Sequence, residues 1–332
     1  MSSARSASLG APFDLRGKRV WVAGHSGMVG SAIARRLARE GCEVLTATRA
    51  TVDLRRQAET EEWVEKQRPD AVFLAAATVG GIQANAAHPA EFLYDNLAIA
   101  TNVVHAAYRA GVGKLMVLGS SCIYPKVTPQ PIPEAALLTG ALEATNAAYA
   151  VAKIAAIRLA QSYRREHGCD FIAAMPTSLY GGGDNFDPGS SHVIPGMMVR
   201  FDEARRQGRS VVSIWGSGAP RREFLFVDDL ADALVFLMQR YSDEDHVNVG
   251  WGEDVSIREL AQTIARVTGF QGELEFDRSK PDGTPRKLLD TSRMQALGWR
   301  PTTGLENGLR ITYRHYLATA ELPAKRAGAN AA

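Results

Sequence analysis

The sequence predicts an α/β fold, in which a doubly wound parallel sheet carries a smaller, interleaved C-terminal lobe. Three observations lead to this prediction. Short apolar runs rich in β-formers alternate with helical patterns through the first half of the chain. A glycine-rich turn joins the first apolar run to the first helical pattern. After residue 180 this alternation gives way to a long loop and shorter, mixed elements.

The first half of the chain is expected to supply the sheet. Apolar β-rich runs predict strands at 18–24, 42–49, 70–77, 114–121 and 170–176. Helical spacing, repeatedly stopped by a glycine, predicts helices at 31–41, 96–111 and 148–168. Strands and helices in this order favour parallel pairing with helices on the faces of the sheet.

The second half is expected to form the lobe and to return to the first sheet. Residues 181–196 form a loop rich in Gly, Pro, Asp and Ser, of a length that usually serves a function. A helix at 256–269 should begin with Ser256 and Glu259 as a capping box. Further elements are expected as a strand and turn at 210–218, a helix at 227–241 and a sheet strand at 246–250.

Composition excludes several classes of protein. Of the 332 residues 45% are hydrophobic and 22% charged, which is enough apolar material for a sizeable core. A net charge of +2 without basic–aromatic alternation argues against a nucleic-acid partner. No apolar run approaches the roughly 18 residues that cross a bilayer, so no membrane partner is expected.

Cysteine usage and the chain ends favour a cytoplasmic protein. Cys42, Cys122 and Cys169 lack CxxC spacing, and the seven histidines lack ligand spacing, so neither disulfides nor a metal site is expected. The Ser/Arg/Ala-rich N-terminus has no apolar segment of a secretory signal. A disordered extension is favoured there over a transit peptide.

The first turn has the pattern of a phosphate-binding loop. It reads Gly24-His25-Ser26-Gly27-Met28-Val29-Gly30, between a predicted strand and a predicted helix. The glycines permit a tight turn and close backbone approach, and the free N–H groups of the helix favour a pyrophosphate. This context predicts a Rossmann domain that binds a dinucleotide, against the alternative of a tight turn without a ligand. The GxxGxxG spacing is typical of short-chain dehydrogenases/reductases.

The predicted domains follow from this loop and from the change of texture at residue 181. We expect a dinucleotide-binding domain at 17–180, with later returns at about 225–250. A substrate lobe is expected at 181–224 and 251–317. Flexible tails are expected at 1–16 and 319–332.

The end of the second predicted strand bears on the choice of dinucleotide. An acidic residue there would bond the ribose of NAD, but the sequence reads Ala47, Thr48, Arg49 and Ala50. A guanidinium can meet the 2′-phosphate of NADP with two parallel hydrogen bonds, so Arg49 favours NADP(H). The alternative is that Arg49 is a solvated surface residue.

A tyrosine and a lysine at helical spacing suggest reductase chemistry. Tyr149 and Lys153 lie four residues apart and share one face of the helix predicted at 148–168. An ammonium beside a phenol is expected to lower the tyrosine pKa from about 10 and to make Tyr149 a proton donor near neutral pH. Ser120, at a predicted strand end, would hold the reacting carbonyl beside it. The alternative is an amphipathic core helix with an incidental pair.

Several segments resemble those of the GDP-L-fucose synthase family, a group of extended short-chain dehydrogenases/reductases. They are GHSGMVGSAI, LAAATVGGI, GSSCIYPK, YAVAKIA, MPTSLYG, DNFDPGSSHVIP, WGSGAPRREFLFVDD and KPDGTPRKLLD, and the resemblance runs from about residue 18 to 317. It implies conversion of GDP-4-keto-6-deoxy-D-mannose into GDP-L-fucose. The family epimerises C3 and C5 of the sugar and then reduces the C4 ketone with NADPH.

The resemblance assigns roles to the catalytic candidates. Cys122 would be the base and His192 the acid of the epimerisations, because a C4 ketone acidifies the protons on both neighbouring carbons. Ser120 and Tyr149 would stabilise the enolate, and Lys153 would hold the cofactor ribose. Two plain readings stay open: Cys122 as a small buried hydrophobe, and His192 as a loop or capping residue. Cys42 and Cys169 are expected to be structural.

The resemblance also extends the binding sites. The diphosphate of a GDP-sugar requires arginine or lysine in the lobe, and Arg200, Arg222 and the Arg286–Lys287 pair are candidates. The resemblance implies Arg200 and Arg222 at phosphate or ribose, Trp215 by the nucleotide and Asp282 on a polar edge. Beyond the glycine loop, Arg49 and Ser120, the cofactor site would include Leu118, Gly119, Ser121, Lys153, Pro176, Thr177, Ser178, Leu179 and His192. One departure stands out, since some family members carry an arginine where this chain has Ser26.

Two alternative functions remain at this point. One is a reductase or epimerase of a related GDP-sugar, such as a colitose or 6-deoxy-heptose precursor. The other is a non-catalytic NADP-sensing protein on the same fold. In either case the helices at 96–110 and 149–167 resemble the pair through which such reductases form dimers, so a homodimer is expected.

Overall fold

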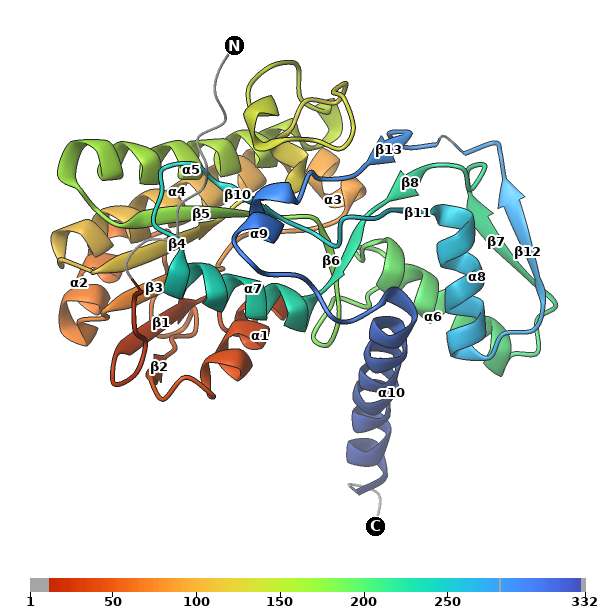
Figure 1. Ribbon diagram of the computed structural model, residues 1–332. Helices are drawn as coiled ribbons and strands as arrows, with labels where there is room; N and C mark the ends of the chain where they lie inside the picture. The colour runs from red at the N-terminus through yellow and green to blue at the C-terminus, as the bar shows by residue number, and fades with distance from the viewer. Residues whose placement is uncertain (1–11, 281, 330–332) are drawn as a thin grey trace.

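The computed structural model describes residues 12–280 and 282–329. Its centre is a six-stranded sheet in the order β10-β5-β4-β3-β1-β2, in which every adjacent pair is parallel (Figure 1). The strands are β1 (Arg19–Ala23), β2 (Glu43–Leu45), β3 (Ala71–Leu74), β4 (Lys114–Leu118), β5 (Phe171–Pro176) and β10 (Val247–Val249). The predicted doubly wound parallel sheet is confirmed, and the strand expected at 246–250 joins it beside β5.

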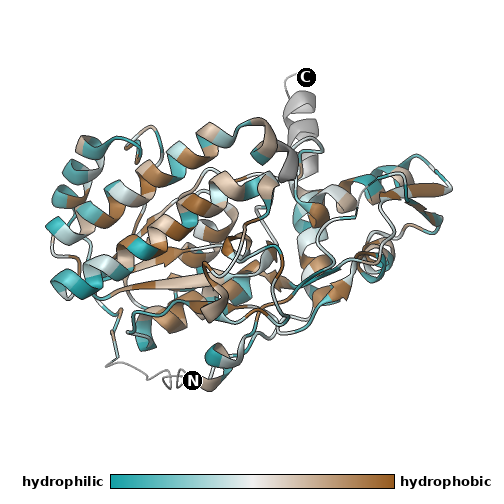
Figure 2. Cartoon of the chain, turned by 90° about the horizontal axis from the view of Figure 1, so that it is seen from above, coloured by the Kyte–Doolittle hydropathy of each residue, from teal (hydrophilic) through white to brown (hydrophobic). Residues whose placement is uncertain are grey.

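Helices cover both faces of this sheet. On one face lie α1 (Met28–Leu37) and α7 (Val227–Arg240), and on the other lie α2 (Gln57–Gln67), α4 (Pro89–Arg109) and α5 (Ala147–His167) (Figure 1). Alternation along β1 shows why both faces need cover. Val20 and Val22 pack with α1 and α7, whereas Trp21 and Ala23 pack with the other group. In Figure 2 the strands are accordingly apolar and lie between helices with polar outer faces.

The second half adds a smaller lobe with its own core. Its helices are α6 (Val193–Arg206), α8 (Ile257–Thr268) and α10 (Leu305–Ala329). Short strands pair as β7 (Val211–Trp215) with β12 (Glu273–Asp277), as β8 (Arg221–Arg222) with β11 (Val255–Ser256) and β13 (Arg286–Lys287), and as β6 (Ser178–Tyr180) with β9 (Phe224–Phe226). Ser256 and Glu259 form the predicted capping box at the start of α8.

Short elements complete the connections between these units. Two of them flank the predicted catalytic segment: η1 (Ser121–Ile123) follows β4, and η3 (Ala144–Asn146) leads into α5. The others are α3 (Ile82–Ala87), η2 (Glu134–Ala136) and α9 (Ser292–Ala296). Within the described ranges, none of the helices combines the length and apolar character that a membrane-spanning segment needs.

The described residues enter both segments that were predicted to be tails, 1–16 and 319–332. Residues 1–11 lie outside the described residues, but Leu15 is fully buried and the Phe13 N–H donates to the Gln239 carbonyl. These two apolar side chains pack against the core at the amino ends of the strands and shield it from solvent. At the other end α10 continues to Ala329. The long helix expected at 96–111 also starts earlier, with Pro89 in its first turn.

Candidate functional site

Several of the predicted cofactor and catalytic residues follow strands at the carboxyl edge of the parallel sheet. The glycine loop follows β1, Ser120 and Cys122 follow β4, and Thr177 follows β5. Carboxyl ends of parallel strands meet at one edge, so residues distant in sequence become neighbours there. The chain order alone therefore brings the cofactor candidates and the catalytic candidates to the same edge.

The glycine loop is shaped to admit a ligand at the helix terminus. Gly24 has a φ of +91°, and the Gly27 N–H donates to its carbonyl oxygen at 3.1 Å. A Cβ on Gly30 would lie 2.1 Å from that oxygen, and one on Gly24 would lie 2.5 Å from the Ala76 nitrogen. Helix α1 then begins at Met28 without a side-chain cap, which leaves its first N–H groups to an anion.

Two further observations fit a dinucleotide at this loop. The Nδ1 atom of His25 is buried without a hydrogen-bond partner among the described residues, so a ligand can satisfy it. Arg49, after β2, has 69% of its side chain exposed and stands 3.9 Å from the Asp53 carboxylate. That carboxylate is held more closely by Arg55, whose hydrogen bond lowers the pKa of Asp53 to about 2. The Arg49 guanidinium is thus accessible, although its contact with a cofactor stays a prediction.

Ser120, Tyr149 and Lys153 come together beneath the site. The Lys153 ammonium is buried, donates to the Leu118 carbonyl at 3.0 Å, and lies 5.7 Å from the centre of the Tyr149 ring. Burial lowers the pKa of Lys153 to about 8. The helix spacing that predicted this pair is confirmed, since both side chains leave the same face of α5.

The predicted direction of the tyrosine pKa is wrong. Burial raises the pKa of the Tyr149 phenol, a Cys122 thiolate raises it further, and the Ser120 hydroxyl opposes both. Water exclusion disfavours the phenolate, and the Lys153 ammonium donates its hydrogen bond to the Leu118 carbonyl rather than to the phenol oxygen. Tyr149 is therefore a phenol, ready to donate a proton rather than to accept one.

Cys122 lies in the same enclosed environment. It is 8% exposed, sits in η1, and packs in a cluster with Ile123 and Leu289 that Tyr149 also touches. Burial raises the pKa of the Cys122 thiol, and Lys287, Ser120 and Lys153 oppose that rise in this order. The thiol consequently adjoins the predicted reductase residues Ser120, Tyr149 and Lys153, and it also lies close to Lys287. Cys42 and Cys169 are half-buried free thiols outside this cluster.

The turn that carries Cys122 rests on a buried polar network that the sequence analysis missed. The Tyr124 hydroxyl donates to Asn248 Oδ1 at 2.5 Å and lies 2.9 Å from His246 Nε2. Burial lowers the pKa of His246 to about 4, so its ring is neutral, with one nitrogen that donates a hydrogen bond and one that accepts. Only the adjacency of Tyr124 to the cysteine hinted at this role, because its partners come from β10 and the segment before it.

His192 reaches the site from the long loop. It is the N-cap residue of α6, and the loop before it touches the segment after β3, where the Gly81 N–H donates to the Ser190 carbonyl at 3.4 Å. Its side chain is exposed, and desolvation by the surrounding chain lowers the pKa of the imidazole. Among the described residues, no hydrogen bond joins this ring to Cys122, Tyr149 or Ser120. The loop before His192 therefore packs on the segment after β3, and the role of His192 opposite the thiol stays a prediction.

The substrate candidates lie in the second lobe. The Arg222 guanidinium donates to the Thr284 carbonyl at 2.5 Å, and that of Arg200 donates to Ser213 at 3.3 Å. Burial lowers the pKa of both arginines. Asp282 accepts the Ser217 N–H at 2.8 Å and hydroxyl at 2.6 Å, so its carboxylate ties the 216–218 turn in place. Trp215, at the end of β7, is 60% exposed, and the Lys280 ammonium lies 5.8 Å from the centre of its ring.

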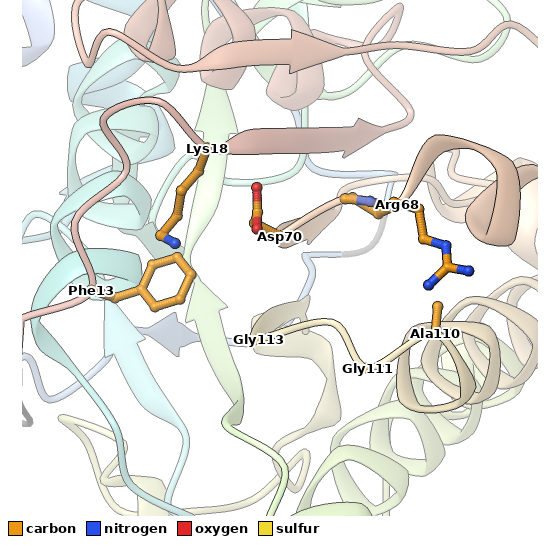
Figure 3. A pocket seen from close by; sticks show the side chains of 8 residues that line it. Phe13, Lys18, Arg68, Asp70, Ala110, Gly111 and Gly113 are labelled. Atoms are coloured by element: carbon orange, nitrogen blue, oxygen red, sulfur yellow. The ribbon is translucent and has the colours of Figure 1, made fainter.

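Two hollows lie away from this constellation. One of about 270 Å³ opens at the amino ends of the strands, where the Lys18 ammonium stands 5.1 Å above the Phe13 ring and the Asp70 carboxylate lies near (Figure 3). The other, about 460 Å³, lies between α1 and α7 and is lined by paired arginines and aspartates. Neither hollow is lined by a predicted site residue. Parallel sheets bind ligands at the carboxyl ends of their strands, whereas the first hollow lies at the amino ends.

Comparisons with known proteins agree with this geometry. A GDP-L-fucose synthase of Sinorhizobium fredii is 55% identical over 304 residues, which is 92% of this chain and 97% of that protein. A GDP-L-colitose synthase of Yersinia pseudotuberculosis is 36% identical over 90% of this chain and 98% of its own. The structure of a GDP-L-fucose synthetase from Naegleria fowleri bound to NADP matches with a TM-score of 0.87 at 28% identity, over 95% and 99% of the two chains. The sequence profile of the NAD dependent epimerase/dehydratase family matches residues 20–250, and the chain belongs to that family.

Proposed function

We propose that this chain converts GDP-4-keto-6-deoxy-D-mannose into GDP-L-fucose with NADP(H) as its cofactor. One juxtaposition carries the proposal: a buried thiol, Cys122, adjoins Tyr149 and Lys153 at the carboxyl edge of the sheet. A base beside a reductase set suits an enzyme that first moves protons and then reduces. The 55% identity to a GDP-L-fucose synthase supports this choice of substrate.

Cys122 serves as the base of both epimerisations. Its thiolate takes the proton from C3, and later from C5, and becomes a thiol, while the C–H electron pair moves into an enolate with its charge on O4. The hydroxyls of Ser120 and Tyr149 donate hydrogen bonds to that oxygen. His192 delivers a proton to the opposite face of the carbon, which inverts it. Exchange with water returns a proton to His192 and removes one from Cys122.

Tyr149 serves as the acid of the reduction. NADPH, when bound, supplies a hydride to C4. The raised pKa of Tyr149 keeps the phenol protonated until O4 accepts its proton. Lys153 hydrogen-bonds the cofactor ribose and stabilises the phenolate that is left. Ser120 holds O4 in place through both stages.

Other residues bind the two ligands. Loop residues 24–30 and the start of α1 hold the pyrophosphate, and Arg49 holds the 2′-phosphate of NADP. The remaining cofactor contacts come from Leu118, Gly119, Ser121, Pro176, Thr177, Ser178 and Leu179. In the lobe, Arg200 and Arg222 meet the diphosphate or ribose of GDP, Trp215 lies against the nucleotide, and Asp282 bonds a polar edge. This division makes 17–180 the cofactor domain, with returns near 225–250, and 181–224 with 251–317 the substrate lobe.

The experiment that tests the proposal separates the two stages. In deuterated water without NADPH, the wild-type chain should exchange the C3 and C5 hydrogens of GDP-4-keto-6-deoxy-D-mannose, as NMR would show. Cys122→Ser should slow this exchange at least 100-fold, because serine is a far weaker base. Tyr149→Phe should still exchange through Cys122, although more slowly because the enolate loses one hydrogen bond. It should reduce the ketone about 10²–10⁴-fold more slowly than the wild-type chain, because it lacks the proton donor.

Matched variants and products decide the outcome. Cys42→Ser removes a thiol outside the site and should leave both stages unchanged. The wild-type product with NADPH should be GDP-L-fucose by NMR. Absence of exchange in the wild-type chain, or exchange that survives Cys122→Ser, would overturn the proposed mechanism.

A related GDP-sugar is the second candidate substrate. The GDP-L-colitose synthase relative, at 36% identity, is the observation that favours it. Turnover of a 3-deoxy or heptose 4-keto substrate in preference to the mannose derivative would support this candidate. NADPH binding without turnover of any 4-keto sugar nucleotide would instead indicate a sensing protein.

We also propose a cytoplasmic homodimer. Its interface would use α4 and α5, which pack against each other and carry the exposed apolar side chains of Tyr94 and Val151. Light scattering of the purified chain should give twice the 35.9 kDa chain mass. A monomer at micromolar concentration would contradict the proposal.

A further inference from the structure

Lys287 is held in a fixed strand beside the predicted base. It pairs with Arg222 in the β8–β13 register, and the Glu223 N–H donates to its carbonyl at 3.2 Å. On the other edge, the next residue accepts the Ile132 N–H at 2.8 Å. The segment 286–289 is therefore extended and anchored on both sides.

The direction of the Lys287 side chain follows from this extension. Alternate residues of an extended segment point to the same side, so Lys287 and Leu289 share one side. Leu289 is 1% exposed and packs in the cluster that contains Cys122 and Ile123. Lys287 consequently projects along the Cys122 side. It is half-buried, and no carboxylate among the described residues lies within 4.0 Å of its ammonium.

We propose that the Lys287 ammonium stabilises the Cys122 thiolate when the thiol loses its proton. Lys287 is thus a positioning residue for the base, and the inference rests on the function proposed for Cys122. A half-buried ammonium without a carboxylate partner lacks a counter-charge, and a thiolate supplies it. The ammonium would thereby make proton abstraction by the sulfur easier than burial alone allows.

The surrounding charges agree with this pairing. Burial raises the pKa of the Cys122 thiol, and Lys287 is the strongest of the groups that oppose the rise, ahead of Ser120 and Lys153. Burial lowers the pKa of Lys287, and the Cys122 thiolate is the group that most strongly opposes this decrease. Two further groups act on Lys287: Arg222 on β8 disfavours its charge, and Glu143 before η3 favours it. Tyr149, on α5, is a further titratable neighbour of the thiol, and a Cys122 thiolate raises the pKa of Tyr149.

The test measures the reactivity of the thiol in the full chain. In a Cys42→Ser/Cys169→Ser background, iodoacetamide alkylates Cys122 as the thiolate, forming a thioether and releasing iodide. Lys287→Met should move the pH profile of the alkylation rate upward by about one pKa unit, a roughly tenfold slower reaction at pH 7. Lys287→Arg keeps the charge and should retain most of the wild-type rate.

A neighbouring lysine provides the control. Lys126 pairs with Glu143 at 3.0 Å and is largely exposed. Lys126→Met therefore removes a nearby positive charge that does not face the thiol. It should leave the profile unchanged. An unchanged profile in Lys287→Met, or an equal shift in Lys126→Met, would overturn the inference. Should Lys287→Met fail to fold, Lys287→Gln gives the same comparison, with far-ultraviolet circular dichroism as the check on folding.

Failure of this inference is distinguishable from failure of the proposed function. If Lys287→Met leaves the alkylation profile unchanged while the wild-type chain exchanges C3 and C5 hydrogens, the lysine assignment is wrong and Cys122 remains the base. If the profile shifts as expected but no exchange occurs, the thiolate pair is present and the proposed function is wrong.

Discussion

Lys153 serves the proposed site but destabilises the folded chain. Its pKa falls from 10.5 to about 8 because burial disfavours the ammonium. Below pH 8 both the folded and the unfolded chain hold the proton, and the penalty is fully present. Between pH 8 and 10.5 only the unfolded chain keeps the proton, so rising pH relieves the penalty. The difference, at 1.36 kcal/mol per pKa unit, is about 3 kcal/mol.

Lys153→Met should therefore stabilise the chain near neutral pH. The hydrogen bond to the Leu118 carbonyl is lost, which offsets about 1 kcal/mol, so the net gain at pH 7 should be about 1–2 kcal/mol. The advantage should shrink as pH rises from 8 to 10.5. Thermal unfolding at pH 7 and pH 10 measures both values, with exposed Lys126→Met as the control. A difference between variant and wild type that does not change with pH would contradict the assignment.

At this scale the sequence predicts residues whose relation is local. Tyr149 and Lys153 share one helix, so their spacing alone places them together. The direction of the Tyr149 pKa could not be read from spacing, because it depends on how completely the fold excludes water. Lys287 and Tyr124 act on Cys122 through strands and networks built from distant segments, which periodicity does not reveal.

At the scale of elements, the β1–α1 turn depends on the absence of one Cβ. Gly30→Ala would put a methyl group 2.1 Å from the Gly24 carbonyl oxygen, a backbone atom that cannot move aside cheaply. Helix α1 must then shift away from the turn, and its first N–H groups no longer point toward the pyrophosphate. The affinity for NADPH should fall at least tenfold, as cofactor fluorescence would report.

Gly304→Ala is the matched control for that change. A Cβ on Gly304 meets nothing within 4 Å, and its φ is not in the left-handed region. The substitution should leave NADPH affinity unchanged. Equal affinities of the Gly30→Ala and wild-type chains would show that the turn does not hold the pyrophosphate.

Elements with a strong period were predictable, and their ends were less so. The strands and helices of the sheet follow from apolar runs and glycine stops, and the capping box of α8 from two residues. Strand β2 proved shorter than predicted, Glu43–Leu45 against 42–49, because the residues after Leu45 leave the sheet edge. The burial of Leu15 was missed, since one apolar residue beside glycine and charged residues has no period.

At the scale of the whole molecule, one buried carboxyl group joins the sheet to the lobe. Glu223 lies between β8 and β9 and is 1% exposed. Its two oxygens accept the N–H of Gly252 at 2.7 Å, just after β10, and of Leu289 at 3.1 Å, just after β13. Its backbone carbonyl accepts the Thr177 hydroxyl at 3.3 Å, after β5. The segment with Lys287 is thus fixed relative to the carboxyl edge of the sheet.

Glu223→Ala should consequently weaken the fold and the site together. It leaves two buried N–H groups without an acceptor, which costs about 2–6 kcal/mol. At about 2–4 °C per kcal/mol, the unfolding midpoint should fall by roughly 5–20 °C. Glu223→Gln retains one acceptor oxygen, so its unfolding midpoint should lie between those of Glu223→Ala and the wild type. Exposed Glu253→Ala should match the wild type.

Because the 286–289 strand loses an anchor, the Cys122 alkylation rate of Glu223→Ala should also drop below that of Glu253→Ala at a temperature where both are folded. A midpoint within 2 °C of the wild type, with unchanged alkylation, would show that the lobe is held to the sheet by its apolar contacts alone.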